Sequence, residues 1–414
     1  MSSIRGFLGL LRVLPADASE RRLLASAAVA LVRQRHRMIW AAAPLLARMP
    51  SARPAKLALW RQLAAAQLGR TRLQVDPASL VEALQATQAY RDAQHRLSVS
   101  ATGLHLRGQA YRALAQAWCG NPPERLLIFH HYDSRGGLPR SWQESLLAIQ
   151  AAGWQVMVSS TDLEFDVIEG LQAGGIQVAL RSNIGLCLGA YRDLSLLLTS
   201  KPAAASRLRS LVLCNDSNLP LQAPAALLSQ LQAWSDAHER SAEPVLAGLT
   251  DSAQRACYHL QSFFLYANRA LLEHPAWLRF WLGFSLAGSK DELINHGEIG
   301  LSQAMLAAGV QLRPAYPLVQ GLLADPAMAE ELQRYSIWQP RHVNQSLFAW
   351  QSLLGRGFPL VKKHVLFELI ENQGLPMAMA ELARWIPEER RELLAADLQE
   401  LFVSRYSGGT PELG

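Results

Sequence analysis

The chain has 414 residues, half of them hydrophobic and 18% charged, which is long enough for two or three globular domains and excludes a disordered or collagen-like protein. Its net charge of +6 is uneven: residues 1–75 hold 13 Lys and Arg against two acidic residues, and the remainder holds 27 against 32. The four cysteines are scattered and form no C-x-x-C pair, which argues against a disulfide framework or a zinc knuckle and favours reduced thiols in a cytosolic enzyme. No run of about 18 apolar residues and no clean signal-peptide cleavage pattern occur, so we expect no spanning helix and a cytoplasmic location.

Residues 1–121 are expected to form a basic helical N-terminal region. Helical patterns at 20–37 and 56–68 combine leucines with basic residues, and Arg33, Arg35 and Arg37 crowd the end of the first. Basic helices with Leu and Trp suit an anionic membrane surface, so the protein is expected to lie peripherally at the inner face of the cytoplasmic membrane. The alternative is a helical subdomain packed on the body of the protein with its arginines in solvent. Nucleic acid is not an expected partner, because no helix-turn-helix, zinc finger or ribonucleoprotein motif accompanies the charge.

The region from 122 to 330, which begins at a Pro-Pro pair, alternates apolar strands with helices. Strands are predicted at 125–132, 154–160, 176–181, 211–214 and 245–249, and helices at 142–152, 167–173 and 191–198. Continuous apolar strands separated by helices are typical of a parallel sheet covered on both faces, so the predicted class is α/β. A helical C-terminal region, 331–414, with a helix at 387–402, is expected to complete the core.

Ligands of such sheets bind beyond the carboxyl ends of the strands, and polar residues follow every predicted strand. They are His131-Tyr132-Asp133, Thr161-Asp162, Arg181-Ser182-Asn183, Asn215-Asp216-Ser217 and Thr250-Asp251. No G-x-G-x-x-G, Walker or G-x-S-x-G pattern accompanies them, which argues against a dinucleotide, ATP or α/β-hydrolase site. His130 and His131 are neighbours on a strand and point to opposite faces, so they are not expected to share a metal ion.

Asn215-Asp216-Ser217 points most directly to a chemistry. A lone acid after a buried strand, followed by a polar loop, is where nucleotide-sugar transferases place their metal-binding acid. The departing nucleoside diphosphate carries concentrated negative charge, which Mn²⁺ or Mg²⁺ held by a carboxylate would neutralise. Asp216 is therefore the predicted metal ligand. The alternative is that Asp216 caps a helix beginning near Pro220 or holds a turn.

Seven short stretches stand in order from Leu126 to Glu371, over about three-fifths of the chain. They are His131-Tyr132-Asp133; Arg181-Ser182-Asn183-Ile184-Gly185; Val212-Leu213-Cys214-Asn215-Asp216-Ser217; Gly248-Leu249-Thr250-Asp251; His259-Leu260-Gln261-Ser262-Phe263-Phe264; Glu298-Ile299-Gly300-Leu301-Ser302; and Asn344 through Gly357-Phe358-Pro359-Leu360-Val361-Lys362-Lys363. In order and spacing they resemble the rhamnan synthesis protein F family of bacterial surface-polysaccharide enzymes. The resemblance implies a glycosyltransferase of rhamnan and O-antigen assembly with a GT-A-like nucleotide-sugar-binding core. The N-terminal arm lies outside it.

Two positions depart from the family pattern. Where the family has an aromatic residue and then an Asp, this chain has Leu186 and Cys187, and Leu246-Ala247 replaces an aromatic pair. A carboxylate expected near the donor is therefore missing. Its loss indicates either a changed donor sugar or a degenerate, non-catalytic member.

The resemblance suggests roles for several residues around the predicted metal. His131 and Asp133 would lie near the base and ribose; Arg181 and Asn183 would contact the donor; Asn215 and Ser217 would orient phosphate oxygens; Gln261 and Ser262, on an apolar helix, would reach sugar hydroxyls; and Lys362 and Lys363 would meet the diphosphate. For Arg181 the alternative is a surface ion pair, and for Gln261 and Ser262 it is ordinary helix polarity.

Glu298 is the first candidate for the general base of an inverting transfer, which must deprotonate the acceptor hydroxyl. It stands among His296, Gly297 and Gly300, a small-residue setting that favours close approach of a substrate. Asp251 is the second candidate. The alternative for Glu298 is a first-turn acid on the helix running to 308, stabilised by the helix dipole.

The expected function is transfer of a sugar, with rhamnose one candidate, from a nucleotide-sugar donor to a growing cell-surface polysaccharide or lipid-linked glycan. One alternative is a degenerate transferase-like subunit that scaffolds a polysaccharide assembly complex at the membrane. Another is a sugar-binding protein without turnover.

Overall fold

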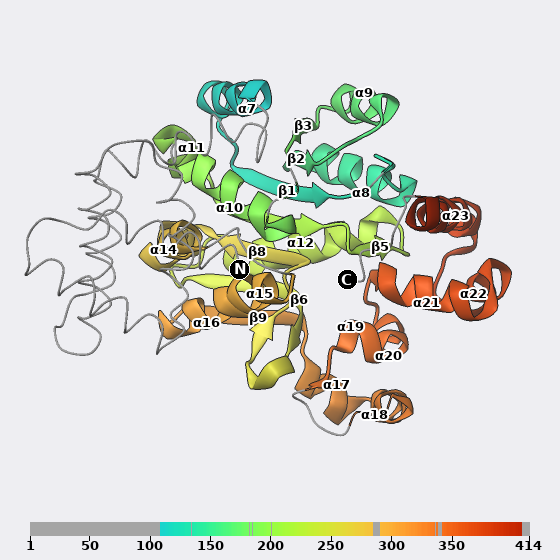
Figure 1. The fold of residues 1–414 in the computed structure, drawn as a ribbon. Helices are drawn as coiled ribbons and strands as arrows, with labels where there is room; N and C mark the ends of the chain where they lie inside the picture. The colour runs from blue at the N-terminus through green and yellow to red at the C-terminus, as the bar shows by residue number, and fades with distance from the viewer. Residues whose placement is uncertain are drawn as a thin grey trace, which may run out of the picture.

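The computed structural model describes residues 108–407 apart from 134, 182, 184, 200, 285–289, 336 and 338–341 (Figure 1). The predictions for the basic segment 1–75 lie outside the described residues. None of the helices that are described is both long and apolar enough to cross a membrane.

The centre of the fold is an eight-stranded mixed sheet with the order β3-β2-β1-β4-β8-β6-β7, in which β9 also pairs with β6. The strands are β1 (Arg125–His131), β2 (Gln155–Ser160), β3 (Gln177–Leu180), β4 (Ser210–Asn215), β6 (Val245–Ser252), β7 (His259–Leu260), β8 (Phe264–Asn268) and β9 (Gln311–Tyr316). β1 to β4 are mutually parallel and β9 is parallel to β6, whereas β8 runs antiparallel between β4 and β6. A separate antiparallel ribbon pairs β5 (Asn218–Pro220) with β10 (Leu360–Lys362).

The predicted α/β class with a mostly parallel sheet is confirmed, and all five predicted strands are present. The prediction that Gln261 and Ser262 lie on an apolar helix is wrong, because they stand between β7 and β8. The strand β8 is buried along its whole length and reads as a continuous apolar run. Such a run has no period of two, so it cannot be distinguished from a buried helix by pattern alone.

Helices cover both faces of the sheet (Figure 1). They are α7 (Gly108–Gly120), α8 (Arg140–Ala151), α9 (Phe165–Ala173), α10 (Leu186–Thr199), α11 (Pro202–Arg207), α12 (Pro224–His238), α13 (Arg269–Glu273), α14 (Pro275–Gly283), α15 (Lys290–Leu293), α16 (Gly300–Ala307), α17 (Leu318–Ala324), α18 (Pro326–Arg334), α19 (Gln345–Phe348), α20 (Trp350–Gly355), α21 (Lys363–Gln373), α22 (Leu375–Leu382) and α23 (Arg391–Ser407). Two short 3₁₀ helices occupy Gln254–Ala256 and Glu388–Arg390, and a π-helical turn occupies Ile294–Ile299. The helices predicted at 142–152, 167–173, 191–198 and 387–402 are confirmed with shifted ends.

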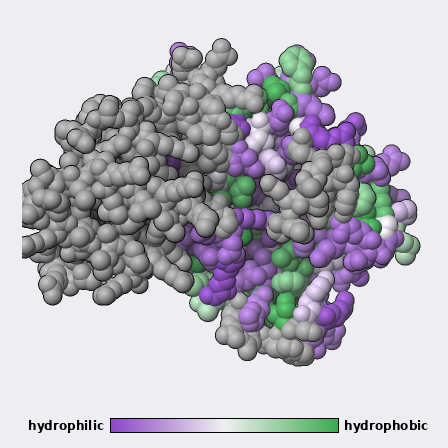
Figure 2. All heavy atoms as spheres, in the orientation of Figure 1, coloured by the Kyte–Doolittle hydropathy of each residue, from purple (hydrophilic) through white to green (hydrophobic). Residues whose placement is uncertain are grey.

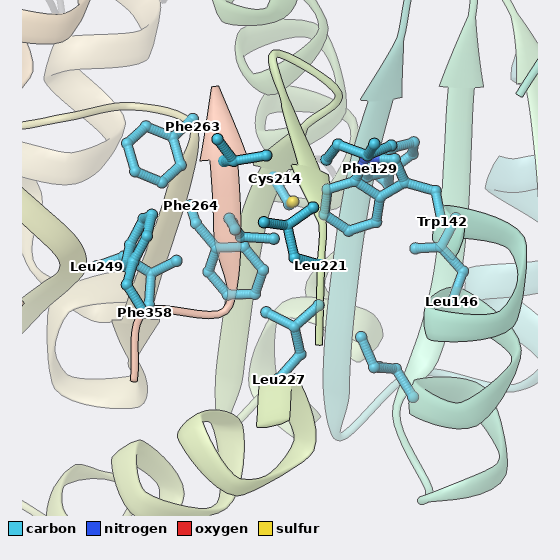
Figure 3. Close-up of a cluster of buried hydrophobic side chains, with 14 of the residues drawn as sticks. Phe129, Trp142, Leu146, Cys214, Leu221, Leu227, Leu249, Phe263, Phe264 and Phe358 are labelled. Carbon is cyan, nitrogen blue, oxygen red and sulfur yellow. The ribbon is translucent and has the colours of Figure 1, made fainter. Parts of the chain in front are cut away.

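Alternate side chains of each strand enter two separate cores. Leu127 and Phe129 of β1 belong to one core, which also holds Trp142 of α8 and Leu394 and Leu398 of α23. Figure 3 shows part of this core, where the rings of Phe129 and Trp142 lie 4.7 Å apart between their centroids. The C-terminal helices therefore share a core with the sheet.

The second core covers the opposite face of the sheet. It joins Leu126 and Ile128 of β1 to Leu188 of α10, Trp281 of α14 and Met305 of α16. On the face of the molecule in Figure 2, the visible described residues are mainly hydrophilic, with hydrophobic residues in small groups between them. Among the described residues, most large apolar side chains are buried in the two cores.

Asp397 of α23 supplies the N-terminal cap of a helix far away in the sequence. Its two carboxylate oxygens accept hydrogen bonds from the backbone N–H groups of Arg140 (2.7 Å) and Ser141 (3.0 Å), the first residues of α8. Pro139, at the N-cap position of α8, provides no side-chain bond. The first N–H groups of a helix have no hydrogen-bond acceptors within that helix. The buried carboxylate of Asp397 supplies the acceptors for α8, and its negative charge is favourable at a helix N-terminus.

Replacing Asp397 is therefore expected to destabilise the protein. In urea denaturation, Asp397→Ala should lower the free energy of unfolding by about 1–3 kcal/mol, the usual cost of leaving buried donors unpaired. Asp397→Asn retains one acceptor oxygen and should lose less. Asp166→Ala, at an exposed acid in the first turn of α9, serves as the control. Equal unfolding free energies for Asp397→Ala and this control would show that the cap contributes nothing.

Candidate functional site

The candidate site lies at the edge of the sheet where β1, β4 and β6 end and where the reversed strand β8 begins. The β5–β10 ribbon adjoins this edge, because β5 follows the loop after β4. The ribbon continues by one bond beyond its strands, from the backbone N–H of Lys363 to the carbonyl of Ser217 (2.9 Å). The ribbon thus carries the start of α21 to the loop that follows β4.

Asp216 and Lys363 form an ion pair at this point. Lys363 Nζ lies 2.8 Å from Asp216 Oδ2, and their side chains are only 14% and 12% exposed. Burial alone would raise the pKa of Asp216, but the ammonium of Lys363 opposes this effect, and the pKa of Asp216 lies below its ordinary value. Asp216 is consequently a carboxylate at neutral pH, with one ammonium group beside it.

The neighbours of Asp216 shape the loop after β4. Asn215 Oδ1 accepts a hydrogen bond from the backbone N–H of Ser217 (3.0 Å), which is the pattern of an Asx turn. The Asp216 N–H donates to the carbonyl of His130 (3.2 Å). Asn215 and Ser217, predicted to orient phosphate oxygens, are therefore placed directly beside Asp216, and Asn215 Oδ1 is engaged within the loop.

Cys187, which departs from the pattern of the family that the sequence resembles, lies beside this loop. Its thiol hydrogen-bonds with Asn215, and burial together with the charge of Glu298 raises the pKa of Cys187 to about 12. Since Asp216 also acts on this thiol, Cys187 stands within electrostatic reach of both acids. A carboxylate in its position would add a third negative charge to the site.

His131 is fully buried at the end of β1 and ties two loops together. Its Nδ1 lies 2.9 Å from Ser160 Oγ, and its Nε2 lies 2.9 Å from the carbonyl of Gly137. Asp133 Oδ1 accepts the N–H of Arg135 (2.8 Å) in the turn that follows. Both ring nitrogens of His131 are engaged inside the protein, so this arrangement gives the ring a structural task rather than a contact with a nucleotide.

Arg181 is buried rather than in a surface ion pair, the alternative that its sequence position left open. Its Nη2 lies 3.1 Å from Asp193 Oδ2, and Nη1 donates to the carbonyl of Leu186 (3.4 Å). Asn183 stands nearby, next to His130 at the end of β1. Burial lowers the pKa of His130 to about 3, with Arg181 adding to the effect, so this ring is neutral. Through its hydrogen bond to Leu186 and its ion pair with Asp193, Arg181 thus holds the first turns of α10 in place.

Glu298 is held by the turn between β7 and β8. The backbone N–H and the hydroxyl of Ser262 both donate to Glu298 Oε2, at 2.7 and 2.6 Å. Glu298 Oε1 lies 3.7 Å from His259 Nε2, and the Glu298 side chain is 18% exposed. Ser262, predicted to reach sugar hydroxyls, instead bonds to the predicted base. Oε2 of Glu298 thus accepts two hydrogen bonds, while for Oε1 the described residues provide a long contact with His259.

Glu298 lies in a single π-helical turn, Ile294–Ile299, that precedes α16. We predicted that the glycines around it make room for a substrate, but at Gly297 the space is filled by the core. A Cβ there would lie 2.3 Å from Leu188 Cδ1 and 3.1 Å from the ring of Phe284. Gly297 therefore allows the turn to approach α10 and α14 closely.

A chain of hydrogen bonds joins β6 to the β10 strand. Thr250 Oγ1 donates to Gln261 Oε1 (2.8 Å), and Gln261 Nε2 donates to Asn344 Oδ1 (3.0 Å). Ser346 Oγ also donates to Asn344 Oδ1 (2.7 Å), and Lys362 Nζ lies 3.4 Å from Ser346 Oγ. Both ends of the Gln261 amide are used inside this chain of bonds, which buttresses the edge of the sheet.

Lys362 and Lys363 are adjacent in the sequence but serve different acids. Burial lowers the pKa of Lys362, against the opposing effect of the negative charge of Glu298. Lys362 therefore lies near Glu298, whereas Lys363 bonds to Asp216. Lys363 thus lies beside Asp216, whereas Lys362 Nζ lies 3.4 Å from Ser346 Oγ.

Asp251, the second candidate base, is held on all sides by protein. Its Oδ1 accepts hydrogen bonds from the N–H of Leu318 (2.7 Å) and from Gln345 Nε2 (3.1 Å), and burial raises its pKa. Asp251 thus joins β6 to the first residues of α17 and α19. Glu298, unlike Asp251, shares electrostatic contacts with Cys187 and Lys362.

Two members of the site were not found from the sequence. Ser160 holds His131, and Ser346 connects Asn344 to Lys362. The only signal for Ser160 was its position at the end of a predicted strand, and Ser346 carried none beyond the stretch that begins at Asn344.

The predicted metal at Asp216 has a poor set of donors. Within 108–407, gaps apart, no group of three or more His, Cys, Asp and Glu is arranged to hold a metal ion. The Asp216 carboxylate already has the ammonium of Lys363 at 2.8 Å from its Oδ2. A divalent ion at Oδ2 would have to displace Lys363, and one at Oδ1 would lie close to the Lys363 charge, so the ion pair disfavours such an ion.

No family model matches this chain, and a search of curated proteins finds no match to it.

The tight contacts at Gly297 lead to a stability prediction. Gly297→Ala should lower the free energy of unfolding by about 1–3 kcal/mol, because the new methyl group overpacks the core between α10 and α14. Gly300→Ala is the matched control, since its nearest non-neighbouring atom would be at an ordinary 3.4 Å and Ala favours a helix. Chemical denaturation of both variants measures the difference. A Gly297→Ala protein as stable as Gly300→Ala would contradict the close packing.

Proposed function

We propose that the chain is a bacterial glycosyltransferase, which moves a sugar from a nucleotide-sugar donor to a cell-surface polysaccharide or a lipid-linked glycan. The observation that carries the proposal is the pairing of a buried carboxylate, Asp216, with Lys363 at the carboxyl edge of a mostly parallel sheet. Glu298 lies within electrostatic reach of Cys187 and Lys362. The resemblance to the rhamnan synthesis family over 126–371 supports the same function, and the mixed sheet is compatible with a GT-A-like core.

In this proposal the acceptor hydroxyl attacks the anomeric carbon of the donor while the bond to the diphosphate oxygen breaks. Glu298 takes the hydroxyl proton through Oε1, since Oε2 already accepts two hydrogen bonds from Ser262. Those two bonds fix the orientation of the carboxylate. The diphosphate departs with the bonding electrons, and its charge needs a cation at the sheet edge. The sequence predicts Mn²⁺ or Mg²⁺ at Asp216 for this purpose, and the contacts of Asp216 favour another group.

A second candidate, a degenerate subunit without turnover, is favoured by one observation. Cys187 occupies the position of the family acid inside the site, and its buried thiol is uncharged. A sugar-binding or scaffolding protein could tolerate that change more readily than an enzyme that needs the carboxylate. Sugar release by the parent chain, measured against a panel of nucleotide sugars, separates the two candidates.

The role of Glu298 gives a direct test of the enzymatic proposal. Glu298→Gln keeps the shape of the side chain but cannot take up the proton, so turnover should fall by on the order of 10² to 10⁴. Donor affinity should stay nearly unchanged, because a base acts on the chemical step. Asp251→Asn, run in parallel, should reduce stability more than turnover, since Asp251 holds α17 and Gln345. High turnover in Glu298→Gln together with its loss in Asp251→Asn would reverse the two assignments.

The basic segment 1–75 is proposed to bind an anionic membrane surface near the acceptor. The full chain should sediment with vesicles that contain phosphatidylglycerol, and a chain without residues 1–75 should not. Added salt should weaken the binding, because exposed charges are screened beyond about 8 Å at physiological ionic strength. Neutral phosphatidylcholine vesicles provide the control. Equal sedimentation of the full and shortened chains with anionic vesicles would refute this role.

A further inference from the structure

Lys363 is held at two points beside the loop that follows β4. It is the first residue of α21, and its backbone is fixed by the bond to Ser217 at the end of the β5–β10 ribbon. Its ammonium is fixed by Asp216 at 2.8 Å. Both the start and the tip of this flexible side chain are thus held at the ligand edge of the sheet.

We infer that Lys363 is itself the cation that neutralises the diphosphate of a bound nucleotide, in place of a divalent metal ion, with Asp216 as its positioning residue. The inference rests on the proposed function and concerns the same site. Lys binds phosphates as a compact point charge, and a charge held in advance costs no reorganisation when the diphosphate departs. Asp216 would orient this charge without touching the nucleotide.

The charges of the site favour an anionic ligand over a second cation. Asp216 is ionised and balanced by Lys363, so the pair is neutral as it stands. A divalent ion would compete with the ammonium for a single carboxylate, whereas a diphosphate would interact with an ammonium that is 14% exposed. Lys362 precedes Lys363 at the end of β10, and its Nζ lies 3.4 Å from Ser346 Oγ.

The N-terminus of α21 also favours an anionic ligand at this edge of the sheet. This helix of 11 residues has no side chain capping its N-terminus and no acid in its first turn. The backbone N–H of Lys363 is bonded to Ser217, but the positive end of the helix dipole still favours anions. Lys363 therefore joins a fixed ammonium to a helix end that is suited to phosphate oxygens.

Calorimetric titration of the full chain with UDP, GDP and dTDP, in EDTA and again in Mn²⁺, tests the inference. At least one nucleoside diphosphate should bind in EDTA, with a Kd that Mn²⁺ changes by less than about threefold. Lys363→Met should weaken this binding by about 10- to 100-fold, the worth of one hydrogen bond to a charged group. Lys363→Arg should restore most of it, and Asp216→Asn should weaken binding in EDTA less than Lys363→Met does.

Lys201→Met is the matched control, because Lys201 precedes α11, which leads into the opposite, amino edge of the sheet at β4. Binding that requires Mn²⁺ and disappears in Asp216→Asn would overturn the inference and leave the proposed function intact. Undiminished nucleotide binding by a folded Lys363→Met protein would also overturn the inference and leave the proposed function intact. Absence of binding in both buffers would overturn the inference together with the proposed function. The comparison of buffers uses the parent chain and holds even where a variant fails to fold.

Discussion

The pairing of three residues of β5 with three residues of β10 determines how the candidate site is assembled. This ribbon brings a segment near residue 360 against the loop that follows β4, about 140 residues earlier in the chain. Two consequences follow at its end: Lys363 meets Asp216, and Lys362 lies near Glu298. Because the same segment continues into α21 to α23, which pack on the core around Phe129, the position of the lysines depends on the packing of the whole C-terminal region.

Buried charge is concentrated at this edge and is balanced locally. The Asp216 carboxylate has Lys363, the Glu298 carboxylate has Ser262 and lies near Lys362, and Arg181 has Asp193. Taking a charge out of water is costly unless a partner compensates for it, so such a concentration persists where the fold holds each pair in place. Perturbed ionisation of this kind gathers at functional sites, and here it coincides with the ligand edge of the sheet.

The sequence predicts the parallel part of the sheet well, because β1, β2 and β4 are continuous apolar runs and the helix between β1 and β2 has a clear period. It does not predict β8, which is buried on both faces, or β5 and β10, which are too short to show any period. The acid at Asp216 was found by its place after β4. Its partner Lys363 was found only as a phosphate contact, since the ion pair depends on tertiary pairing through the ribbon.

Tertiary contacts, which the sequence does not show, also decide the role of polar side chains whose residue type suggested a ligand contact. His131 and Gln261 are polar residues at the predicted edge, but their polar atoms are satisfied within the protein. Sequence position fixes the neighbourhood of such a residue, whereas its free hydrogen-bonding capacity depends on partners such as Ser160 and Asn344. Glu298 differs from both, because among the described residues the contact of its Oε1 is a long one, 3.7 Å to His259 Nε2.

Hydrogen–deuterium exchange of the full chain tests the location of the site most directly. The ligand is the first nucleotide sugar, from a panel, that raises the Tm of the parent protein, since a ligand of the native state adds to its stability. The account predicts slower exchange at 130–133, 215–217, 261–263 and 362–364 in the presence of this ligand, with little change along α9 and α18. Protection confined to segments away from the carboxyl edge of the sheet would contradict it.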